Sequence, residues 1–368
     1  MNASPHIEKT TSYLIRKVED LDGLKEAWKT LSVSARFPMQ DYAWVRACAA
    51  TLISRHELHV VVVTDHTGPI AIAPLVKRRK GPVRLELLGV EELSEPMDFV
   101  YADEAALRAL AETLAHSRLP LKLQRVPADS PTVAALERAS RGKGFFTCRP
   151  ANPYPRILLD AGWTAPEQRL SSSRRSLLRR MRRRAEQTGT VSWEVLTPEP
   201  SSLAPVLEEA FRVEAASWKG REGTALANET AKGEFFKLYA ASACEEGMLR
   251  LCFLRINGRP AAMQLAVEHK GGYWIFKIGY DDEFAACSPG TLLIEETVRY
   301  AAARGLASYE FLGSVEEWTR MWTEDQYECV SLRSYPLGFN GAVAFGSDAA
   351  RFAAGRIGRI VRREAARR

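Results

Sequence analysis

One short segment in the second half of the chain has the residue types of an anion-binding helix N-terminus. Ser288 suits the N-cap and Pro289 suits the first helical position. In such a helix the amides of Gly290, Thr291 and Leu292 have no intrahelical partner, and a glycine lets a ligand approach the backbone closely. Free N–H groups at a helix N-terminus favour a phosphate or pyrophosphate. A well-capped helix without any ligand fits the same spacing, so both interpretations stay open at this point.

Predicted strands precede and follow this segment. Asn257-Gly258 separates two apolar runs, which is the strongest short-range signal for a β-hairpin. A third run, residues 273–280, follows the Gly271-Gly272 turn. The helix that begins after Ser288 is expected to end at Gly305, and a last strand follows at 307–312. Residues 249–314 are therefore predicted to form three antiparallel strands, a helix and a returning strand.

The chain has a net charge of +6, and its positive charge is concentrated in two arginine-rich segments. Residues 169–184 contain eight arginines and no acid, and residues 351–368 contain seven arginines against Glu364 alone. In the first segment, a narrow apolar stripe leaves the arginines on the opposite helix face; this stripe consists of Leu177, Leu178, Met181 and Ala185. Three interpretations compete: a solvated helix between two domains, a cationic surface for a phosphate-bearing or acidic ligand, and contact with nucleic acid or an anionic membrane. The third is weakened because no aromatic ladder is interleaved with the arginines.

Composition places the chain among globular proteins and excludes several classes. A length of 368 residues predicts two domains, and 46% hydrophobic with 26% charged residues is typical of a soluble protein. We find no apolar run long enough to span a bilayer and no signal peptide at the N-terminus, so we expect a cytoplasmic protein without a transmembrane segment. The six cysteines and six histidines are scattered, which argues against disulfides and a metal site. The dinucleotide-binding and P-loop glycine motifs are absent.

The order of predicted elements indicates an α+β protein with mixed, mostly antiparallel sheets. In the first half, we expect strands at 12–18, 58–64, 69–77, 83–88, 119–126 and 145–159, and helices at 20–35, 41–52, 104–116 and 130–140. In the second half, we expect helices at 170–188, 203–218, 230–244 and 316–322, strands at 191–196 and 327–334, and a helical tail from 341 that docks on the body.

Several short motifs resemble the CelD/BcsL-type acetyltransferases of the GNAT superfamily, whose layout is similar to that of Fem-type peptidoglycan transferases. The matching residues are Glu214, Ser217-Trp218-Lys219-Gly220, Gly223-Thr224-Ala225, Gly279-Tyr280-Asp281, Ser288 to Thr291 and Glu310 to Gly313, with Phe37, Tyr42, Trp44 and Ala71 to Leu75 in the first half. The resemblance implies two tandem GNAT-like domains, at 12–160 and 168–335, followed by a basic helical tail at 341–368.

The resemblance also implies where a ligand binds. The pyrophosphate of an acyl-CoA would lie on the amides of Ser288 to Leu292, and its pantetheine would lie along residues 273–280, at Ile278 and Gly279. Trp218, Lys219, Trp318 and Arg320 are the implied substrate-binding residues. The sequence departs from the family pattern at one point: Trp318 and Thr319 stand where an aromatic-lysine pair is common, so that threonine replaces the lysine, and Arg320 follows. This departure puts activity or donor choice in doubt, because arginine does not match lysine in reach or protonation.

Candidates for a general base or acid lie near the implied thioester position. Glu310 is on the strand after the helix, Asp281 ends the preceding strand, and Tyr280 or Tyr309 could act as the acid. Each of these residues has an alternative structural role as a packing or solvent-facing group.

Three functional hypotheses follow. The first is an N-acyltransferase that uses acetyl-CoA or another acyl-CoA and a small-molecule or saccharide amine, with polysaccharide or cell-envelope metabolism as a setting. The second is a Fem-like transferase that uses aminoacyl-tRNA, suggested by the arginine helix. The third is a non-catalytic binding protein that retains the fold, suggested by Thr319. We expect no DNA partner and no metal, and either a monomer or a homodimer.

Overall fold

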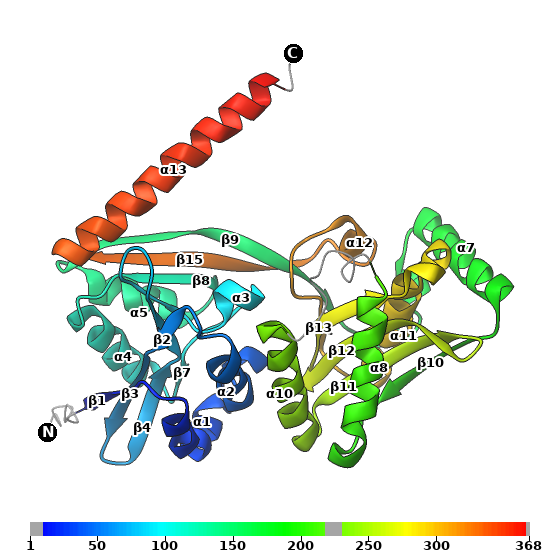
Figure 1. Cartoon of the computed structure of the whole chain (residues 1–368), viewed down its shortest axis with the longest axis horizontal. Helices are drawn as coiled ribbons and strands as arrows, with labels where there is room; N and C mark the ends of the chain where they lie inside the picture. Colours follow the sequence, from blue (N-terminus) through cyan, green and yellow to red (C-terminus); the bar gives the residue numbers. More distant parts are fainter. Residues whose placement is uncertain (1–9, 218–229, 366–368) are drawn as a thin grey trace, which may run out of the picture.

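The computed structural model describes residues 10–217 and 230–365, which form two lobes joined by long strands (Figure 1). Mixed sheets are flanked by helices in both lobes, so the predicted α+β fold class is confirmed. Within the described residues, no helix combines the length and the apolar character needed to cross a membrane.

The first lobe contains a four-stranded sheet and most of the helices of the first half. The sheet order is β1 (Thr11–Ile15), β3 (Val60–Asp65), β4 (Gly68–Ala73) and β7 (Val100–Tyr101). The helical segments are η1 (Glu19–Leu24), α1 (Lys25–Ser32), η2 (Pro38–Gln40), α2 (Tyr42–Thr51), α3 (Val90–Leu93), α4 (Glu104–His116) and α5 (Pro131–Ser140). The helix expected at 20–35 thus begins as a 3-10 segment and becomes α-helical only at Lys25.

An 11-stranded sheet runs through both lobes. Its order is β10 (Val191–Leu196), β11 (Leu249–Ile256), β12 (Arg259–His269), β13 (Gly272–Tyr280), β14 (Ser308–Glu310), β9 (Gly144–Leu158), β15 (Gln326–Pro336), β8 (Leu121–Pro127), β6 (Leu85–Leu87), β5 (Leu75–Arg78) and β2 (His56–Leu58). The pairs β13–β14 and β6–β8 are parallel. Strand β15, which the predicted boundaries assign to the second domain, pairs with β8 and β9 of the first half.

The helices of the second lobe cover both faces of its strands. They are η3 (Ala161–Thr164), α6 (Pro166–Arg169), α7 (Ser172–Thr188), η4 (Pro200–Ser202), α8 (Leu203–Ala215), α10 (Ala231–Glu245), η5 (Asp282–Cys287), α11 (Pro289–Ala303) and α12 (Glu317–Arg320). Helices α8 and α10 lie with the core that extends to the first lobe, whereas α7 and α11 cover the other face.

Local turn and cap signals are mostly confirmed. Asn257 and Gly258 both have positive φ, and the side chains of Thr230 and Ser171 cap α10 and α7. The second hairpin turn differs from the prediction, because Lys270 and Gly271 take the left-handed conformation and Gly272 begins β13.

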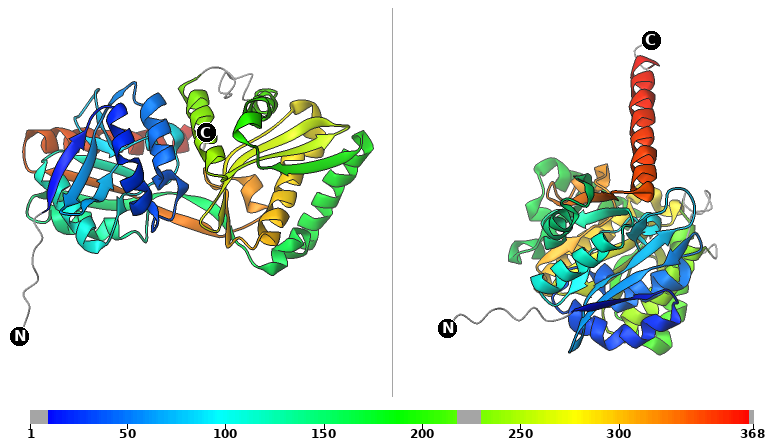
Figure 2. Two further views of the ribbon diagram at one scale, coloured as in Figure 1. Left: turned by 90° about the horizontal axis from the view of Figure 1, so that it is seen from below. Right: turned by 90° about the vertical axis from the view of Figure 1, so that its left-hand side faces the viewer.

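Helix α13 (Phe339–Ala365) docks at its beginning and then projects away from both lobes (Figures 1 and 2). Asp348 fixes its base, because the buried carboxylate accepts hydrogen bonds from Arg84 at 3.1 Å and from the Tyr335 hydroxyl at 2.8 Å. It also pairs with Arg333. The expected docking of the tail therefore holds for the first turns only.

An aromatic cluster joins the two lobes. The ring of Trp44 in α2 lies 4.7 Å from Phe235, 4.9 Å from Tyr239 and 4.8 Å from Phe276 between ring centroids. Trp44 is buried, and one continuous core contains it together with residues of both lobes. The relative position of the lobes therefore depends on packed side chains as well as on the connecting strands.

We expect Trp44→Ala to lower the free energy of unfolding by about 3–5 kcal/mol, because the substitution leaves a large cavity in this core. Denaturant unfolding measures this change. Trp193→Ala is the control, since Trp193 on β10 is 44% exposed, and it should cost much less. Equal losses for both variants would show that the cluster does not hold the lobes together.

Candidate active site

Strand β13 diverges from β14 after a short parallel contact. Residues Gly272 to Trp274 pair with Ser308 to Glu310, and the register ends there. A β-bulge opposite Leu265 and Ala266 also bends β13 at this point. From Ile275 onward, β12 is the strand that pairs with β13 in the described part of the chain. The other edge of β13 therefore has backbone groups that can bind an extended ligand.

The N-terminus of α11 differs from the expected anion site. Ser288 is in the left-handed conformation with φ 51°, and its side chain makes no cap hydrogen bond. Its carbonyl instead accepts the amides of Thr291 at 3.0 Å and Leu292 at 3.3 Å. The prediction of three free amides is therefore wrong for two of them, and the amide of Gly290 is the remaining candidate donor. The 3-10 helix η5 precedes this turn.

The structure does bring three of the predicted site residues together, namely two of the predicted ligand-binding residues and the candidate acid Tyr280. A Cβ placed on Gly290 would lie 3.8 Å from Ile278 Cδ1 and 3.9 Å from Tyr280 Cδ1, which is ordinary contact distance. The side chains of Ile278 and Tyr280 therefore face the start of α11. A Cβ placed on Gly279 would project from the opposite face of β13 and would lie 2.8 Å from the Glu214 Cα in α8. The reason for glycine at 279 is thus the close packing of α8.

Helix α7 places cationic side chains beside this turn. Its apolar stripe contacts α11 and η5, and Arg184 donates to the carbonyl of Ala286 at 3.3 Å. Arg182 pairs with Glu295 at 2.8 Å and Glu296 at 3.0 Å on α11. The phosphates of an acyl-CoA at the start of α11 would therefore meet the Gly290 amide and the arginine of α7 nearest to η5.

Glu310 ends β14 where β13 diverges. The side chain is buried, and its Oε2 has no hydrogen-bond partner among the described residues. Burial raises the pKa of this carboxyl to about 7, against a smaller opposing effect of the Ser308 hydrogen bond and of Arg156 and Arg36. A carboxyl with this pKa accepts a proton readily near neutral pH, as a general base requires.

Glu310 lines a cavity of about 500 Å³ between the lobes. The first lobe contributes Arg36 and Asp129, and the second contributes Lys270 and Trp274. Lys270 holds the lobes together here, because its ammonium donates to the carbonyl of Ser32, the last residue of α1, and to that of Ala35 just beyond it. The cavity thus requires both halves of the chain.

A second carboxyl group lies at the lobe junction and was not found from the sequence. Burial raises the pKa of Glu95 to about 7, although Arg125, Lys277 and the amide of Gly313 favour its charged form. Its Oε2 is shielded from solvent and has no partner among the described residues. Glu95 comes from the loop after α3, which carries no recognisable motif, so only the three-dimensional structure places it near β13.

Two of the other predicted acid–base residues have structural roles. Asp281 Oδ1 accepts the amide of Glu283 at 3.0 Å and so caps η5. Tyr309 is fully buried, with its hydroxyl 2.6 Å from Thr297 Oγ1, and burial raises its pKa well above the usual range. Tyr280 is half-buried at the open edge of β13, so it stays a prediction.

The predicted substrate-binding residues separate into two groups. Trp218 and Lys219 lie outside the described residues. The indole of Trp318 donates to Glu316 at 2.8 Å, and its ring packs edge-on against Phe311. Thr319 forms a capping box with Glu316, which explains a threonine at this position. Arg320 is exposed on α12.

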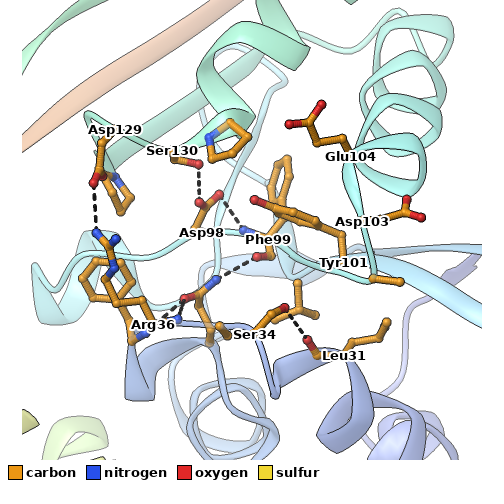
Figure 3. A pocket seen from close by; sticks show the side chains of 17 residues that line it. Leu31, Ser34, Arg36, Asp98, Phe99, Tyr101, Asp103, Glu104, Asp129 and Ser130 are labelled. Atoms are coloured by element: carbon orange, nitrogen blue, oxygen red, sulfur yellow. Dashed lines mark hydrogen bonds and ion pairs between the residues drawn. The ribbon is translucent and has the colours of Figure 1, made fainter. Parts of the chain in front are cut away.

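A further cavity of about 340 Å³ lies in the first lobe (Figure 3). Asp98 is buried at its wall and accepts hydrogen bonds from Thr132 at 2.7 Å and from Ser130. Arg36 and Asp129, paired at 2.9 Å, line both this cavity and the one that contains Glu310. The two cavities are therefore neighbours, separated by one ion pair. Among the described residues, no cluster of His, Cys, Asp or Glu could hold a metal ion.

Comparison with known proteins finds a family match in the second lobe. Residues 172–320 match the family model of the acetyltransferase (GNAT) domain. This match extends from α7 to α12 and includes the start of α11, the open edge of β13 and Glu310. No curated protein matches the chain in sequence.

Solved structures share the fold over both lobes at low sequence identity. The C-terminal domain of a protein assigned as a lysylphosphatidylglycerol synthetase from Agrobacterium fabrum is 11% identical, with a TM-score of 0.57 over 90% of this chain and 96% of that one. FemX is 12% identical, with a TM-score of 0.55 over 89% and 97%. L-PGS from Bacillus licheniformis is 11% identical, with a TM-score of 0.53 over 92% and 98%. These similarities show a common fold.

Gly290→Ala tests whether a ligand approaches the start of α11. The protein itself has room for the methyl group, so we expect unchanged or slightly higher stability, because alanine favours a helix over glycine by about 0.5–1 kcal/mol. Affinity for acetyl-CoA, measured by calorimetry, should fall at least about tenfold. Gly346→Ala in α13 is the matched control, where a Cβ meets nothing within 4 Å. Unchanged affinity of Gly290→Ala for acetyl-CoA would show that the ligand does not approach the start of α11.

Glu310→Gln should change how stability depends on pH. The folded protein holds the Glu310 proton up to about pH 7, whereas an unfolded glutamate loses it near its ordinary pKa of 4.5. The unfolded state therefore binds fewer protons between these values, and the wild type loses stability as pH rises through this window. The variant lacks this loss and should gain up to ~3 kcal/mol relative to wild type between pH 4 and 8. If the free energies of unfolding of the variant and the wild type differ by the same amount at pH 4 and at pH 8, the pKa of Glu310 is not raised.

Proposed function

We propose that the protein is an N-acyltransferase that transfers an acyl group from acyl-CoA to an amine. The observation that carries this proposal is the position of Glu310, a buried carboxyl with a pKa of about 7 at the point where β13 leaves β14. The GNAT domain match over residues 172–320 supports the reaction class. Polysaccharide or cell-envelope metabolism in the cytoplasm remains our preferred setting.

The residues on either side of Glu310 have separate tasks in this proposal. The open edge of β13 and the Gly290 amide would hold the acyl donor, and Arg184 would face its phosphates. Glu310 would take a proton from the acceptor ammonium, so that the neutral amine attacks the thioester carbonyl. An amide bond forms, the carbon–sulfur bond breaks, and the thiolate leaves and is protonated. The partly shielded cavity would exclude water from this step.

A second candidate function is transfer from aminoacyl-tRNA. It is supported by the outer face of α7, where Arg175, Arg179 and Arg183 are exposed at a spacing of one helical turn. None of these three has a described ion-pair partner, so they suit a polyanion. Binding of tRNA that falls steeply with salt would favour this donor over acyl-CoA.

We expect the purified protein to release free thiol from acetyl-CoA when a panel of primary amines is added. Glu310→Gln should lower kcat by about 10²–10⁴-fold, the usual contribution of a general base. The wild-type rate should rise with pH through about 7, because the carboxylate is the active form.

Glu95→Gln serves as the comparison, since its pKa is also raised to about 7. If Glu95→Gln abolishes turnover and Glu310→Gln does not, the base is Glu95. If no amine and no acyl-CoA give thiol release, the proposed acyl-CoA chemistry is wrong, which leaves aminoacyl-tRNA as the donor or a non-catalytic binder with this fold.

A further inference from the structure

Two guanidinium groups lie against one tyrosine ring at the wall of the Glu310 cavity. The Arg36 carbon Cζ lies 5.5 Å from the centroid of Tyr327, and that of Arg156 lies 4.8 Å from it. The hydroxyl of Tyr327 donates to Asp129 at 2.8 Å. The ring of Tyr154 stacks on Tyr327 at 5.4 Å, with the two planes only 1° apart. These contacts hold both cations beside the cavity in a defined arrangement.

Much of the hydrogen-bonding capacity of these arginines is unused within the described residues. Arg156 donates from Nε to Asp325 at 3.1 Å, whereas its two terminal nitrogens have no described partner. Arg36 donates from Nη1 to Asp129 and Tyr327, and its Nη2 likewise has no partner among the described residues. A guanidinium has five donors in a planar fork that matches a carboxylate. The wall of the cavity can therefore bind an anionic oxygen pair.

Strand register places this anion-binding wall next to the base. Arg156 on β9 is directly opposite Glu310 on β14 in an antiparallel pair, so their side chains project from the same face. Glu310 is 95% buried, since its relative exposure is 5%, and its Oε2 has no described partner. The hydroxyl of Tyr154, at 0% exposure, is also unpartnered among the described residues. The buried carboxyl of Glu310 and the hydroxyl of Tyr154 thus lie beside the guanidinium group of Arg156.

We propose that the acceptor in this cavity is an amino acid, whose carboxylate binds Arg156 and Arg36 while its amino group faces Glu310. The assignment rests on the proposed acyl transfer and names its substrate class. The distance across one cross-strand pair, about 5 Å between Cβ atoms, suits an amine and a carboxylate that are attached to the same carbon atom. The cavity of about 500 Å³ has room for the side chain of the amino acid.

Other acceptor classes fit these groups less well. A neutral amino sugar would leave the terminal nitrogens of Arg156 without an anionic partner, and a simple diamine would place a second cation against two arginines and Lys270. Either acceptor would forgo the charge-assisted hydrogen bonds that a carboxylate forms with the guanidinium fork. The chemistry of the wall therefore selects an acceptor that has an anionic group close to the reacting amine.

Binding and turnover test the assignment separately. The full-length protein is titrated calorimetrically, without an acyl donor, with glycine and glycinamide and with L-lysine and cadaverine. We expect each acid to bind at least tenfold more tightly than its partner without a carboxylate. In the thiol-release assay with acetyl-CoA, Arg156→Gln should raise the KM for the acid at least tenfold and raise the KM for the amide much less. Arg156→Lys should restore part of the affinity.

Arg149→Gln is the matched control, because Arg149 lies on the same strand but packs on Phe352 of α13 and does not line the Glu310 cavity. It should leave binding and KM unchanged. If Arg156→Gln does not fold, as judged by its thermal transition, Arg36→Gln tests the same anion site.

Equal binding of acids and amides, or an unchanged KM in both arginine variants, would overturn the assignment. Carboxylate-dependent binding that is lost in Arg156→Gln, together with no thiol release from any amine, would support the amino-acid site and contradict the proposed acyl transfer.

Discussion

The pairing of β14 between β13 and β9 is the constraint on which the candidate site depends. Only three residues of β14 are paired, and the last of them is Glu310, opposite Trp274 on one side and Arg156 on the other. The parallel contact with β13 ends at this point, so the carboxyl group lies where the sheet opens. The antiparallel contact with β9 brings a guanidinium to the same face. A shift of one residue would turn Glu310 toward α11.

The two lobes create the chemical environment of this carboxyl group together. Trp44 packs between α10 and β13, and Lys270 reaches carbonyl groups at and just beyond the end of α1. These contacts cover Glu310 with residues of the first lobe, and burial is the largest cause of its raised pKa. In an isolated second lobe, the same glutamate would be more exposed and closer to its ordinary pKa. The first lobe is therefore part of the site and not only a neighbouring domain.

Features with local causes could be predicted from the sequence. The Asn257-Gly258 turn, the serine cap of α7 and the helix that starts at Pro289 depend on residues close in the chain, and Glu310 was identified as a candidate base. Ser288 takes the left-handed conformation directly after η5, and its carbonyl accepts the amide of Thr291. No sequence signal predicts this conformation. Glu95 and Arg156 reach the site through long-range pairing and lobe packing, which single-residue patterns do not encode.

A crystal structure with a non-hydrolysable acetyl-CoA analogue tests the central claim most directly. The account predicts that the pantetheine lies along Ile275 to Tyr280, that its pyrophosphate lies next to Gly290, and that the acyl carbon lies within reach of Glu310. An analogue bound elsewhere, or with its acyl carbon on the α11 face away from Glu310, would contradict an acyl-transfer site where β13 leaves β14.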